Sequence, residues 1–291
     1  MAIFNTVPPL KAGSGIQFDG EAISTRAAPR NLLDNSDFRK PVNQRGQSSY
    51  TKGSWGGYTI DRWAVGSGTK NTVNIVTDGV SVKGAIIQWL EDVVTKAFLG
   101  KKVTCAAKVN SVVYVLSGVV PDNTGWTKIS TVEFDGGDVT LAVNADKRFE
   151  IAIACATQKT IEWAALYEGE YTAETLPEYQ PKGYAEERLA CTRYFMVANA
   201  WRPIYGNVSW NGQISLTVPT PVEMRINPTG TVIKGTLYVN GVNIDINENP
   251  ANVIKTSNGL QVILSTKAEA NAKHNCAIEI NDTAIYFSAD L

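Results

Sequence analysis

Aromatic side chains that stand beside amide, hydroxyl or guanidinium groups are the residues of this chain with the clearest chemical use. A pyranose ring has an apolar C–H face and a rim of hydroxyl groups, so a protein that binds it needs an exposed flat ring next to polar groups. Segments with turn-forming residues and no strand-like alternation favour such exposure. Six residues meet these conditions and are the predicted glycan-binding candidates: Trp55, Tyr58, Trp126, Trp201, Arg202 and Tyr205.

For each candidate, the alternative is that the side chain packs against its own loop or against a neighbouring subunit. Trp55 lies in Lys52–Tyr58, where glycine and serine neighbours disfavour burial of both ring faces, and Trp126 follows a turn at Asp122–Gly125. Three other tryptophans lie in strand-like or motif positions. Because a buried indole contributes a large apolar area, the residues expected in the core are Trp63, Trp89 and Trp163.

Three carboxylates offer a second interpretation. Asp34, Asp37 and Asp61 could form a glycosidase pair, because hydrolysis needs two acids that flank one bond at a set separation. Against this, Asp34 and Asp37 belong to a turn-forming stretch, and Asp61 beside Arg62 is as readily a structural ion pair. The chain also has no GxSxG nucleophile elbow and no phosphate-binding P-loop. We therefore predict that the protein is not an enzyme.

Cysteine and histidine give no basis for a metal site. The cysteines at positions 105, 155, 191 and 276 have no CxxC spacing, and His274 is the only histidine, so zinc would lack ligands. Calcium at Asp34, Asp37 or Asp122 is conceivable because carboxylate oxygens suit it, but no twelve-residue binding loop supports it. Neither a metal nor a cofactor is predicted.

Length and composition indicate a globular protein of two domains with a short appendage. Of 291 residues, 44% are hydrophobic and 19% are charged, and the formal net charge is -1. Without a dense Lys/Arg block, the counterion release that drives nucleic-acid binding has no source. The sequence has neither a secretion signal nor an uninterrupted apolar run of membrane-spanning length. We predict no nucleic-acid partner, no membrane span and synthesis in a bacterial cytoplasm.

Alternation of apolar residues at period two predicts an all-β protein. The alternating segments are 103–109, 149–155 and 161–167, the denser apolar strands are 85–90 and 112–116, and the turns are 122–125 and 135–138. Many short strands with turns at this spacing indicate a sandwich. Cys105 and Cys155 lie within the strands and are expected to be core thiols.

The C-terminal hundred residues contain repeated hairpin signals. Asn-Gly suits the two positive-φ positions of a type I′ turn, whose twist matches that of the flanking strands. The predicted hairpin tips are Asn211–Gly212, Asn240–Gly241, Asn258–Gly259 and, without a glycine, Asn281–Asp282. These hairpins predict a second, smaller β-sandwich.

One short helix is predicted between the two sandwiches, and we place the domain boundary there. The helix is expected at Tyr184–Ala190, after Pro181 and Gly183, in a segment rich in Ala, Glu, Arg and Leu. Residues 1–30 contain prolines and glycines but few large apolar residues. They cannot bury a core of their own and are expected to be extended, ordered mainly by contact with other chains.

Seven short motifs follow one another in a recognisable order. They are Asn31–Phe38, Pro41–Gly46, Asp61–Trp63, Trp163–Gly169, Pro181–Tyr184, Cys191–Phe195 and Pro221–Arg225. Together they resemble a jelly-roll module of bacteriophage and prophage tail-fibre (receptor-binding) proteins, and the resemblance covers most of residues 31–291. The motifs are turns, strand ends and an interdomain link, so they imply an architecture and do not assign ligand-binding residues.

The resemblance implies a virion protein at the tail tip that adsorbs to host surface polysaccharide by non-catalytic, multivalent binding, as a homotrimer. Residues 1–30 would attach it to other tail or baseplate proteins, residues 31–180 would form a carbohydrate-binding-module-like jelly roll, and residues 181–291 a receptor-binding β-sandwich. Two alternatives stay open. One is a structural baseplate or tail component that binds other virion proteins. The other is a tail-associated polysaccharide depolymerase, which would be expected to show the short repeats of a long β-helix.

Overall fold

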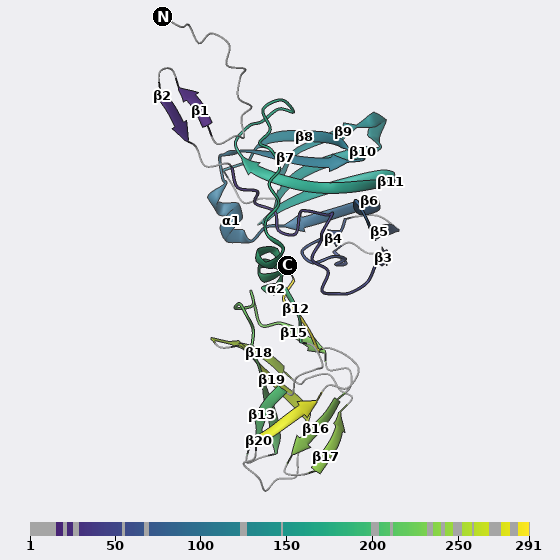
Figure 1. Ribbon diagram of the computed structural model, residues 1–291, viewed down its shortest axis with the longest axis vertical. Coiled ribbons are helices and arrows are strands. Elements are labelled where there is room, and N and C mark those ends of the chain that lie inside the picture. Colours follow the sequence, from purple (N-terminus) through teal and green to yellow (C-terminus); the bar gives the residue numbers. More distant parts are fainter. Residues whose placement is uncertain are drawn as a thin grey trace, which may run out of the picture. The chain divides into compact units, whose positions relative to one another are not determined.

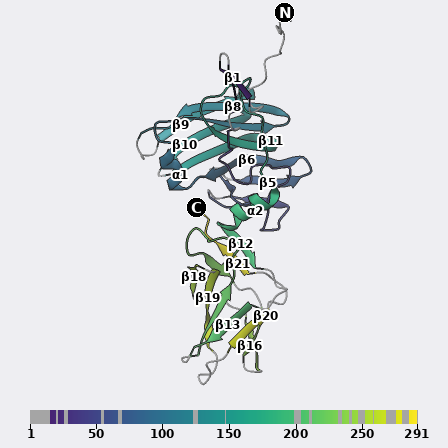
Figure 2. The ribbon, with the colours of Figure 1, turned by 60° about the vertical axis from the view of Figure 1, so that its left-hand side comes forward.

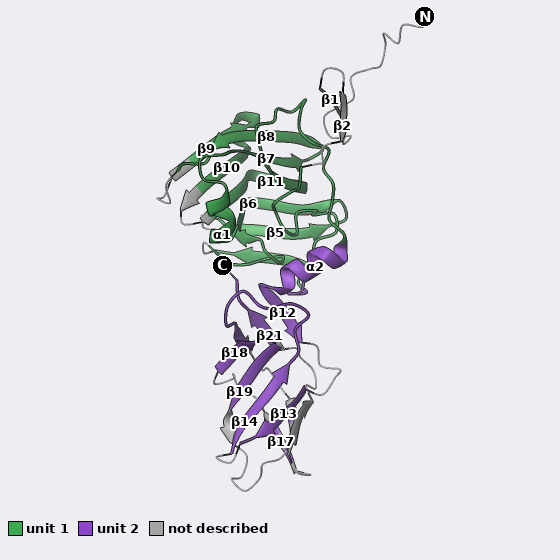
Figure 3. Ribbon diagram, turned by 90° about the vertical axis from the view of Figure 1, so that its left-hand side faces the viewer, with its two compact units in different colours: residues 1–41, 47–183 green, residues 42–46, 184–291 purple. Residues whose placement is uncertain are grey.

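The protein consists of two compact units (Figure 3). A computed structural model describes residues 16–19, 22–25, 29–53, 56–66, 70–122, 127–146, 148–198, 204–209, 212–231, 235–239, 242–246, 252–257, 259–267, 275–279 and 285–290. The first unit comprises residues 1–41 and 47–183, and the second comprises residues 42–46 and 184–291. The main division therefore falls between Gly183 and Tyr184.

The strands confirm the all-β class (Figure 1, Figure 2). Among the described residues, every strand pairing is antiparallel. The main sheet of the first unit contains β3 (Ser49–Lys52), β4 (Ala64–Val65), β5 (Asn71–Val76), β6 (Gly79–Trp89), β7 (Lys102–Val109), β8 (Val112–Val119), β9 (Thr127–Phe134), β10 (Val139–Asp146) and β11 (Arg148–Glu168).

The long strand β11 organises the first unit. Its first half pairs with β6 and β10, and its second half pairs with β7, which continues into β8. Register shifts interrupt these pairings between Cys155 and Lys159 and between Ile161 and Trp163. Because such irregularities bend a strand, β11 can serve both layers of the sandwich.

A single core of buried apolar side chains lies between the layers, with contributions from β7, β8, β10 and β11. Cys105 and Cys155 belong to it, at 0% and 1% exposure, which confirms that both are buried thiols. Burial raises the pKa of each thiol to about 12, so neither thiol is ionised near neutral pH.

The segment that follows β11 covers its outer side. The Trp163 ring stacks on the Tyr179 ring, with centroids 4.7 Å apart and planes 5° apart. Tyr167 meets Tyr171 edge to face at 6.1 Å. Together with Leu176 these rings form a second apolar cluster, which explains how a residue on the outer side of β11 is buried.

Helices are few among the described residues. The predicted helix is confirmed as α2 (Tyr184–Thr192). A further helix, α1 (Asp92–Ala97), is not predicted by the sequence analysis. It has only six residues, too few to show a helical period, and its adjacent valines at 93 and 94 favour strands. The turn predicted at 135–138 is confirmed as the 3-10 turn η1 (Asp135–Gly137).

The second unit is a smaller β-sandwich. Its described strands form one sheet of seven, in the order β17-β16-β20-β13-β14-β19-β18, and one of three, in the order β12-β21-β15. The strands are β12 (Phe195–Ala198), β13 (Ile204–Val208), β14 (Gln213–Val218), β15 (Thr229–Thr231), β16 (Gly235–Val239), β17 (Val242–Ile246), β18 (Asn252–Thr256), β19 (Gly259–Lys267), β20 (Asn275–Glu279) and β21 (Ile285–Ser288). Buried side chains from both sheets, such as Leu216 and Phe287, share one core.

Three of the four predicted hairpins are confirmed by strand pairing. β13 pairs with β14, β16 with β17, and β18 with β19; of the tips, Asn211, Asn240, Gly241 and Asn258 lie outside the described residues. The hairpin predicted at Asn281–Asp282 is wrong. β20 pairs within the larger sheet and β21 within the smaller one, so these two strands do not form a hairpin. Asn281 and Asp282 themselves lie outside the described residues.

The described residues before position 29 form two short paired strands, β1 (Ile16–Asp19) and β2 (Ala22–Thr25). From its sequence this segment is expected to be extended, and the pairing of the two strands is not predicted. The other residues before position 29 lie outside the described ranges.

Residues 42–46 belong to the second unit through contacts with β12 and with the end of the chain. Gln44 Nε2 donates a hydrogen bond to the Phe195 carbonyl oxygen at 2.7 Å. Arg45 forms an ion pair with Asp290 at 2.5 Å, and its guanidinium carbon lies 3.9 Å from the centroid of the Phe195 ring. The second unit is therefore built from two separate parts of the sequence.

Candidate functional site

The first of the seven ordered motifs begins with a buried asparagine that joins distant parts of the first unit. Asn31 Nδ2 donates to Ser36 Oγ at 2.9 Å and to the Ala164 carbonyl oxygen at 3.1 Å. Asn31 Oδ1 accepts from the backbone N–H groups of Leu33 at 3.1 Å and Leu166 at 3.0 Å. One side chain thus fixes the motif against the end of β11.

Asp34 is held by two cations. Its carboxylate lies 3.3 Å from Arg62 Nε and 3.0 Å from Lys182 Nζ. Burial raises the pKa of Asp34, but the charges and hydrogen bonds of Arg62 and Lys182 outweigh burial, so the pKa lies below its ordinary value of 3.8. Arg62 also donates to the Trp89 carbonyl oxygen at 2.9 Å. An ionised Asp34 therefore ties together three parts of the chain.

The second motif of the first unit, Asp61–Trp63, packs against the first. Asn35 Nδ2 donates to the Asp61 carbonyl oxygen at 2.7 Å, and Trp63 Nε1 donates to the Asn35 carbonyl oxygen at 2.8 Å. The Trp63 and Phe38 rings meet edge to face at 5.0 Å. We call the interlocked side chains of Asn31, Asp34, Asn35, Arg62 and Trp63 the cross-brace.

The carboxylates considered for glycosidase chemistry make structural contacts instead. Asp34 is held ionised, Asp61 is 0% exposed, and Asp37 forms an ion pair with Arg39 at 2.7 Å. A glycosidase needs one carboxylic acid that keeps its proton near neutral pH and reaches the sugar. Neither a cation-paired Asp34 nor a solvent-inaccessible Asp61 meets that need.

The three tryptophans predicted to be in the core are buried. Trp63, Trp89 and Trp163 are 0%, 4% and 8% exposed. Trp89 Nε1 donates to Glu150 Oε2 at 2.8 Å, so its polar edge is satisfied inside the protein. None of these rings is available to a ligand.

Of the six predicted glycan-binding residues, Trp55, Trp126, Trp201 and Arg202 lie outside the described residues. Tyr58 is half-buried, and its ring meets Trp89 edge to face at 6.2 Å. Tyr205 is 68% exposed, and no hydrogen bond, ion pair or ring contact joins its side chain to another described residue. Tyr58 belongs to the first unit and Tyr205 to the second.

Tyr205 lies on β13, which is the central one of the seven described strands of the larger sheet. Side chains alternate between the two sides of a strand. On β13, Tyr205 and Asn207 are exposed, whereas the residues beside them in the sequence are buried or partly buried. On β14, Ser215 and Thr217 lie on the same side of the sheet as Tyr205 and Asn207, because the register pairs Asn207 with Ser215. The neighbouring strand β19 contributes a glutamine. We call this surface the Tyr205 face: Tyr205, Asn207, Ser215, Thr217 and Gln261.

Strand pairing fixes the Tyr205 face, and its five side chains are uncharged. The register of β14 with β19 pairs Thr217 with Gln261, whose Nε2 donates to Ser215 Oγ at 3.0 Å. Gly206 permits the close approach of β13 to β14, because a Cβ there would lie 2.1 Å from the Ser215 carbonyl oxygen. Such a face can stack the apolar side of a sugar on Tyr205 while amides and hydroxyls bind its polar rim.

The sequence pattern indicates Tyr205 as a binding candidate but does not indicate its polar neighbours. Two of these neighbours could be found from the sequence. The predicted hairpin at Asn211–Gly212 pairs β13 with β14, and the alternation of side chains then places Ser215 and Thr217 on the same side of the sheet as Tyr205. No local pattern connects Gln261 with Tyr205, because β19 joins the sheet through a long-range pairing.

Metal and membrane chemistry gain no support from the described part of the chain. Within it, no three His, Cys, Asp or Glu side chains are grouped so that they could hold a metal ion. No helix described in the structure combines the length and apolarity needed to cross a membrane. His274 lies outside the described residues.

Comparison with known proteins gives no match. No family model, no curated protein and no solved structure is similar to this chain. The tail-fibre resemblance therefore stays a prediction from the ordered motifs, and the function is inferred from the site itself.

Proposed function

We propose that this protein is a receptor-binding subunit of a bacteriophage or prophage tail fibre that holds host surface polysaccharide without cleaving it. Three features support the proposal: the ordered motifs from Asn31 to Arg225, the two β-sandwich units, and an exposed aromatic surface. In this proposal the subunit is a homotrimer on the virion, and residues 1–30 attach it to other tail or baseplate proteins.

The proposal depends on Tyr205. Its ring is 68% exposed in the middle of a sheet, where it gains little stability from burial and remains available to a ligand. The amides of Asn207 and Gln261 can both donate and accept hydrogen bonds, and the hydroxyls of Ser215 and Thr217 can do the same. An aromatic plane bordered by neutral polar groups matches a pyranose, which has one apolar face and a hydroxyl rim.

Binding at this face requires no bond cleavage. The Tyr205 face contains no carboxylate that could serve as acid, base or nucleophile in glycoside hydrolysis. A shallow face of this kind binds weakly, but three copies per fibre and several fibres per virion make later contacts intramolecular. Avidity can then exceed the affinity of a single site by about two to four decades.

The test compares Tyr205→Ala with Tyr184→Ala in the purified full-length protein. Tyr184 is 54% exposed and lies on α2, outside the Tyr205 face, so it matches Tyr205 in chemistry and exposure. Loss of one aromatic contact costs about 1.4 kcal/mol, which is about tenfold in single-site affinity. We expect Tyr205→Ala to lose at least that much binding on a glycan array and in adsorption to host cells, and Tyr184→Ala to bind like the wild type.

Equal losses in the two variants would contradict the proposal, as would failure of the wild type to bind any host cell or surface polymer. Binding to other tail proteins without any glycan binding would identify a structural tail or baseplate component. Release of reducing ends from host polysaccharide would identify a depolymerase.

A further inference from the structure

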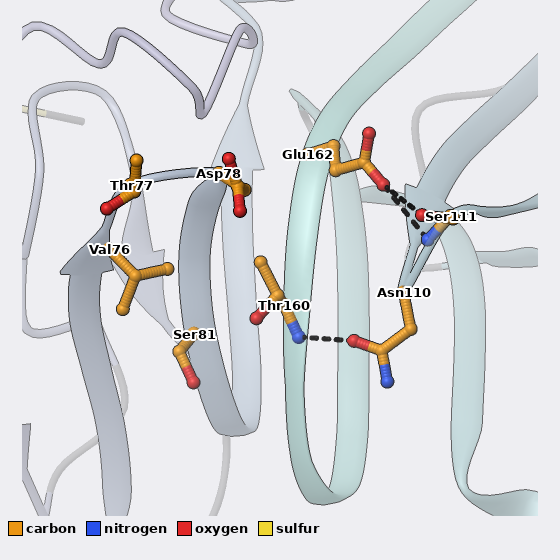
Figure 4. A pocket seen from close by; sticks show the side chains of 8 residues that line it. All are labelled: Val76, Thr77, Asp78, Ser81, Asn110, Ser111, Thr160 and Glu162. Atoms are coloured by element: carbon orange, nitrogen blue, oxygen red, sulfur yellow. Dashed lines mark hydrogen bonds between the residues drawn. The ribbon is translucent and has the colours of Figure 1, made fainter.

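An open polar pocket lies in the first unit, where two hairpin turns flank β11 (Figure 4). Its volume of 440 Å³ is within the range of small-molecule sites. The residues that line it are Val76, Thr77, Asp78, Ser81, Asn110, Ser111, Thr160 and Glu162. None is among the six glycan-binding candidates predicted from the sequence, and the Tyr205 face belongs to the other unit.

Paired strands hold the pocket in shape. β11 lies between β6 and β7 at this point and contributes Thr160 and Glu162. Thr77–Asp78 forms the two-residue turn from β5 to β6, and Asn110–Ser111 forms the two-residue turn from β7 to β8. Asn110 and Ser111 have φ values of 46° and 68°, as in the type I′ turns that match the twist of hairpin strands.

Hydrogen bonds join the β7–β8 turn to β11. Asn110 N donates to the Thr160 carbonyl oxygen at 2.8 Å, and Thr160 N donates to Asn110 Oδ1 at 2.9 Å. Ser111 donates to Glu162 Oε1 from its N–H at 2.9 Å and from its hydroxyl at 3.2 Å. Glu162 Oε2 accepts from Lys108 Nζ at 2.7 Å. One wall of the pocket is therefore fixed before any ligand binds.

Other polar groups of the pocket remain available. No described residue forms a hydrogen bond or ion pair with the Asp78 carboxylate, the Thr77 hydroxyl, the Thr160 hydroxyl or Asn110 Nδ2. These groups come from both turns and from the strand between them (Figure 4). They offer one charged acceptor, one amide donor and two hydroxyls to a ligand.

The charges of the pocket disfavour an acidic ligand. Burial raises the pKa of Glu162, but Lys108 and the hydrogen bonds from Ser111 outweigh burial and lower it, so Glu162 is ionised and matched by a cation. Asp78 has no such cation among the described residues. The uncompensated carboxylate accepts hydrogen bonds from neutral hydroxyls and repels another anion.

We infer that this pocket binds one non-acidic sugar residue through two neighbouring hydroxyl groups. The two oxygens of Asp78 accept hydrogen bonds from the hydroxyl pair, and the Asn110 amide donates to a further sugar oxygen. The eight lining residues include no aromatic ring, so recognition here is by hydrogen bonds, in contrast to stacking on Tyr205. The inference rests on the proposed glycan-binding function and adds a second contact, on the first unit, with its own sugar preference.

The test uses the full-length protein and the methyl glycosides of glucose, galactose, mannose and glucuronic acid, with binding followed by titration and ligand-observed NMR. We expect at least one neutral glycoside to bind and the glucuronide to bind at least tenfold more weakly. Asp78→Asn should lower the affinity for the neutral glycoside at least tenfold, because a hydrogen bond to a charged group is lost. Thr77→Val should lower the same affinity several-fold. Asp122→Asn changes an exposed aspartate of the same unit outside the pocket and should have no effect.

Three results would overturn the inference: no glycoside binds, the glucuronide binds as tightly as the neutral sugars, or Asp78→Asn and Thr77→Val both bind like the wild type. Tyr205→Ala separates this inference from the proposed function. If Tyr205→Ala loses host adsorption while no glycoside responds to Asp78→Asn, the pocket inference fails alone. If a glycoside binds at Asp78 but the wild type adsorbs to no host cell or polymer, the proposed adsorption function fails alone.

Discussion

Trp63 in the first unit and Tyr205 in the second have opposite environments. In the first unit, Trp63 is fully buried within the cross-brace and donates to the Asn35 carbonyl oxygen. In the second unit, Tyr205 is 68% exposed, and no described residue bonds or stacks with its side chain. The short motifs that contain Asn35 and Trp63 thus mark hydrogen bonds that hold the fold together. The residues of the Tyr205 face follow no such motif, because strand pairing alone places them side by side.

The largest effect is expected from breaking the cross-brace at its ring. Trp63→Ala removes a fully buried indole and should lower the free energy of unfolding of the first unit by about 3–5 kcal/mol, as measured by urea denaturation. The Tyr205 face should keep its ligand affinity in the folded fraction. A loss under about 1 kcal/mol would show that the ring is not a core element, since removal of a buried aromatic side chain costs more than that.

A smaller loss is expected where β13 and β14 approach each other closely at Gly206. A Cβ at Gly206 would lie 2.1 Å from the Ser215 carbonyl oxygen, so Gly206→Ala should destabilise the second unit by about 1–3 kcal/mol and weaken glycan binding by displacing Tyr205. Calorimetry should show the change in the transition of that unit alone. Gly183→Ala is the control, because nothing lies within 4 Å of its added Cβ; similar losses in both variants would rule out a steric cause.

The ion pairs of the cross-brace should make the first unit sensitive to acid. Because the pKa of Asp34 is lower in the folded protein than its ordinary 3.8, the unfolded chain takes up a proton first as the pH falls. The stabilisation is therefore complete above pH 3.8 and is lost as the pH falls below it, towards the folded-state pKa. Asp34→Asn should lower the free energy of unfolding by about 1–2 kcal/mol at pH 7. This lies between the effect of losing an exposed ion pair and that of breaking a buried one.

Denaturation midpoints measured between pH 7 and pH 2.5 would check this prediction. The difference in stability between the wild type and Asp34→Asn should shrink across the acid range, whereas Asp122→Asn should follow the wild type throughout. A difference that does not change with pH would show that the charge of Asp34 is not what stabilises the cross-brace.

The smallest effect on stability is expected at the Tyr205 face itself. Tyr205→Ala removes an exposed ring that forms no hydrogen bond, ion pair or ring contact with another described residue. The free energy of unfolding should therefore change by no more than about 0.5 kcal/mol. The same variant is expected to lose about tenfold in single-site glycan affinity. A large loss of stability together with binding would mean that Tyr205 is a packing residue, and the contrast between Trp63 and Tyr205 would disappear.

The fold class can be predicted because alternation is a local property. Residues 103–109 show it plainly and form β7. The continuity of β11 cannot be predicted, because the register shift between Cys155 and Lys159 interrupts the alternation. The sequence around Asn281–Asp282 resembles a hairpin tip, and only the pairing of β21 with β12 and β15 shows that β20 and β21 belong to different sheets.

The candidate sites are less predictable than the fold. Tyr205 is found because its surroundings in the sequence are polar and lack alternation, yet Gln261 reaches it only through the pairing of β14 with β19. The pocket around Asp78 leaves no mark in the sequence. Its two turns resemble ordinary hairpin tips, and they become one site only because β11 passes between β6 and β7.

The second unit is built from two separated parts of the sequence, which limits how it can be exchanged between related chains. A recombination joint at Gly183 would transfer residues 184–291 but leave 42–46 behind. The transferred lobe would then meet a foreign sequence in place of Gln44 and Arg45, which contact Phe195 and Asp290. A functional exchange of the second unit therefore has to keep residues 42–46 matched to residues 184–291.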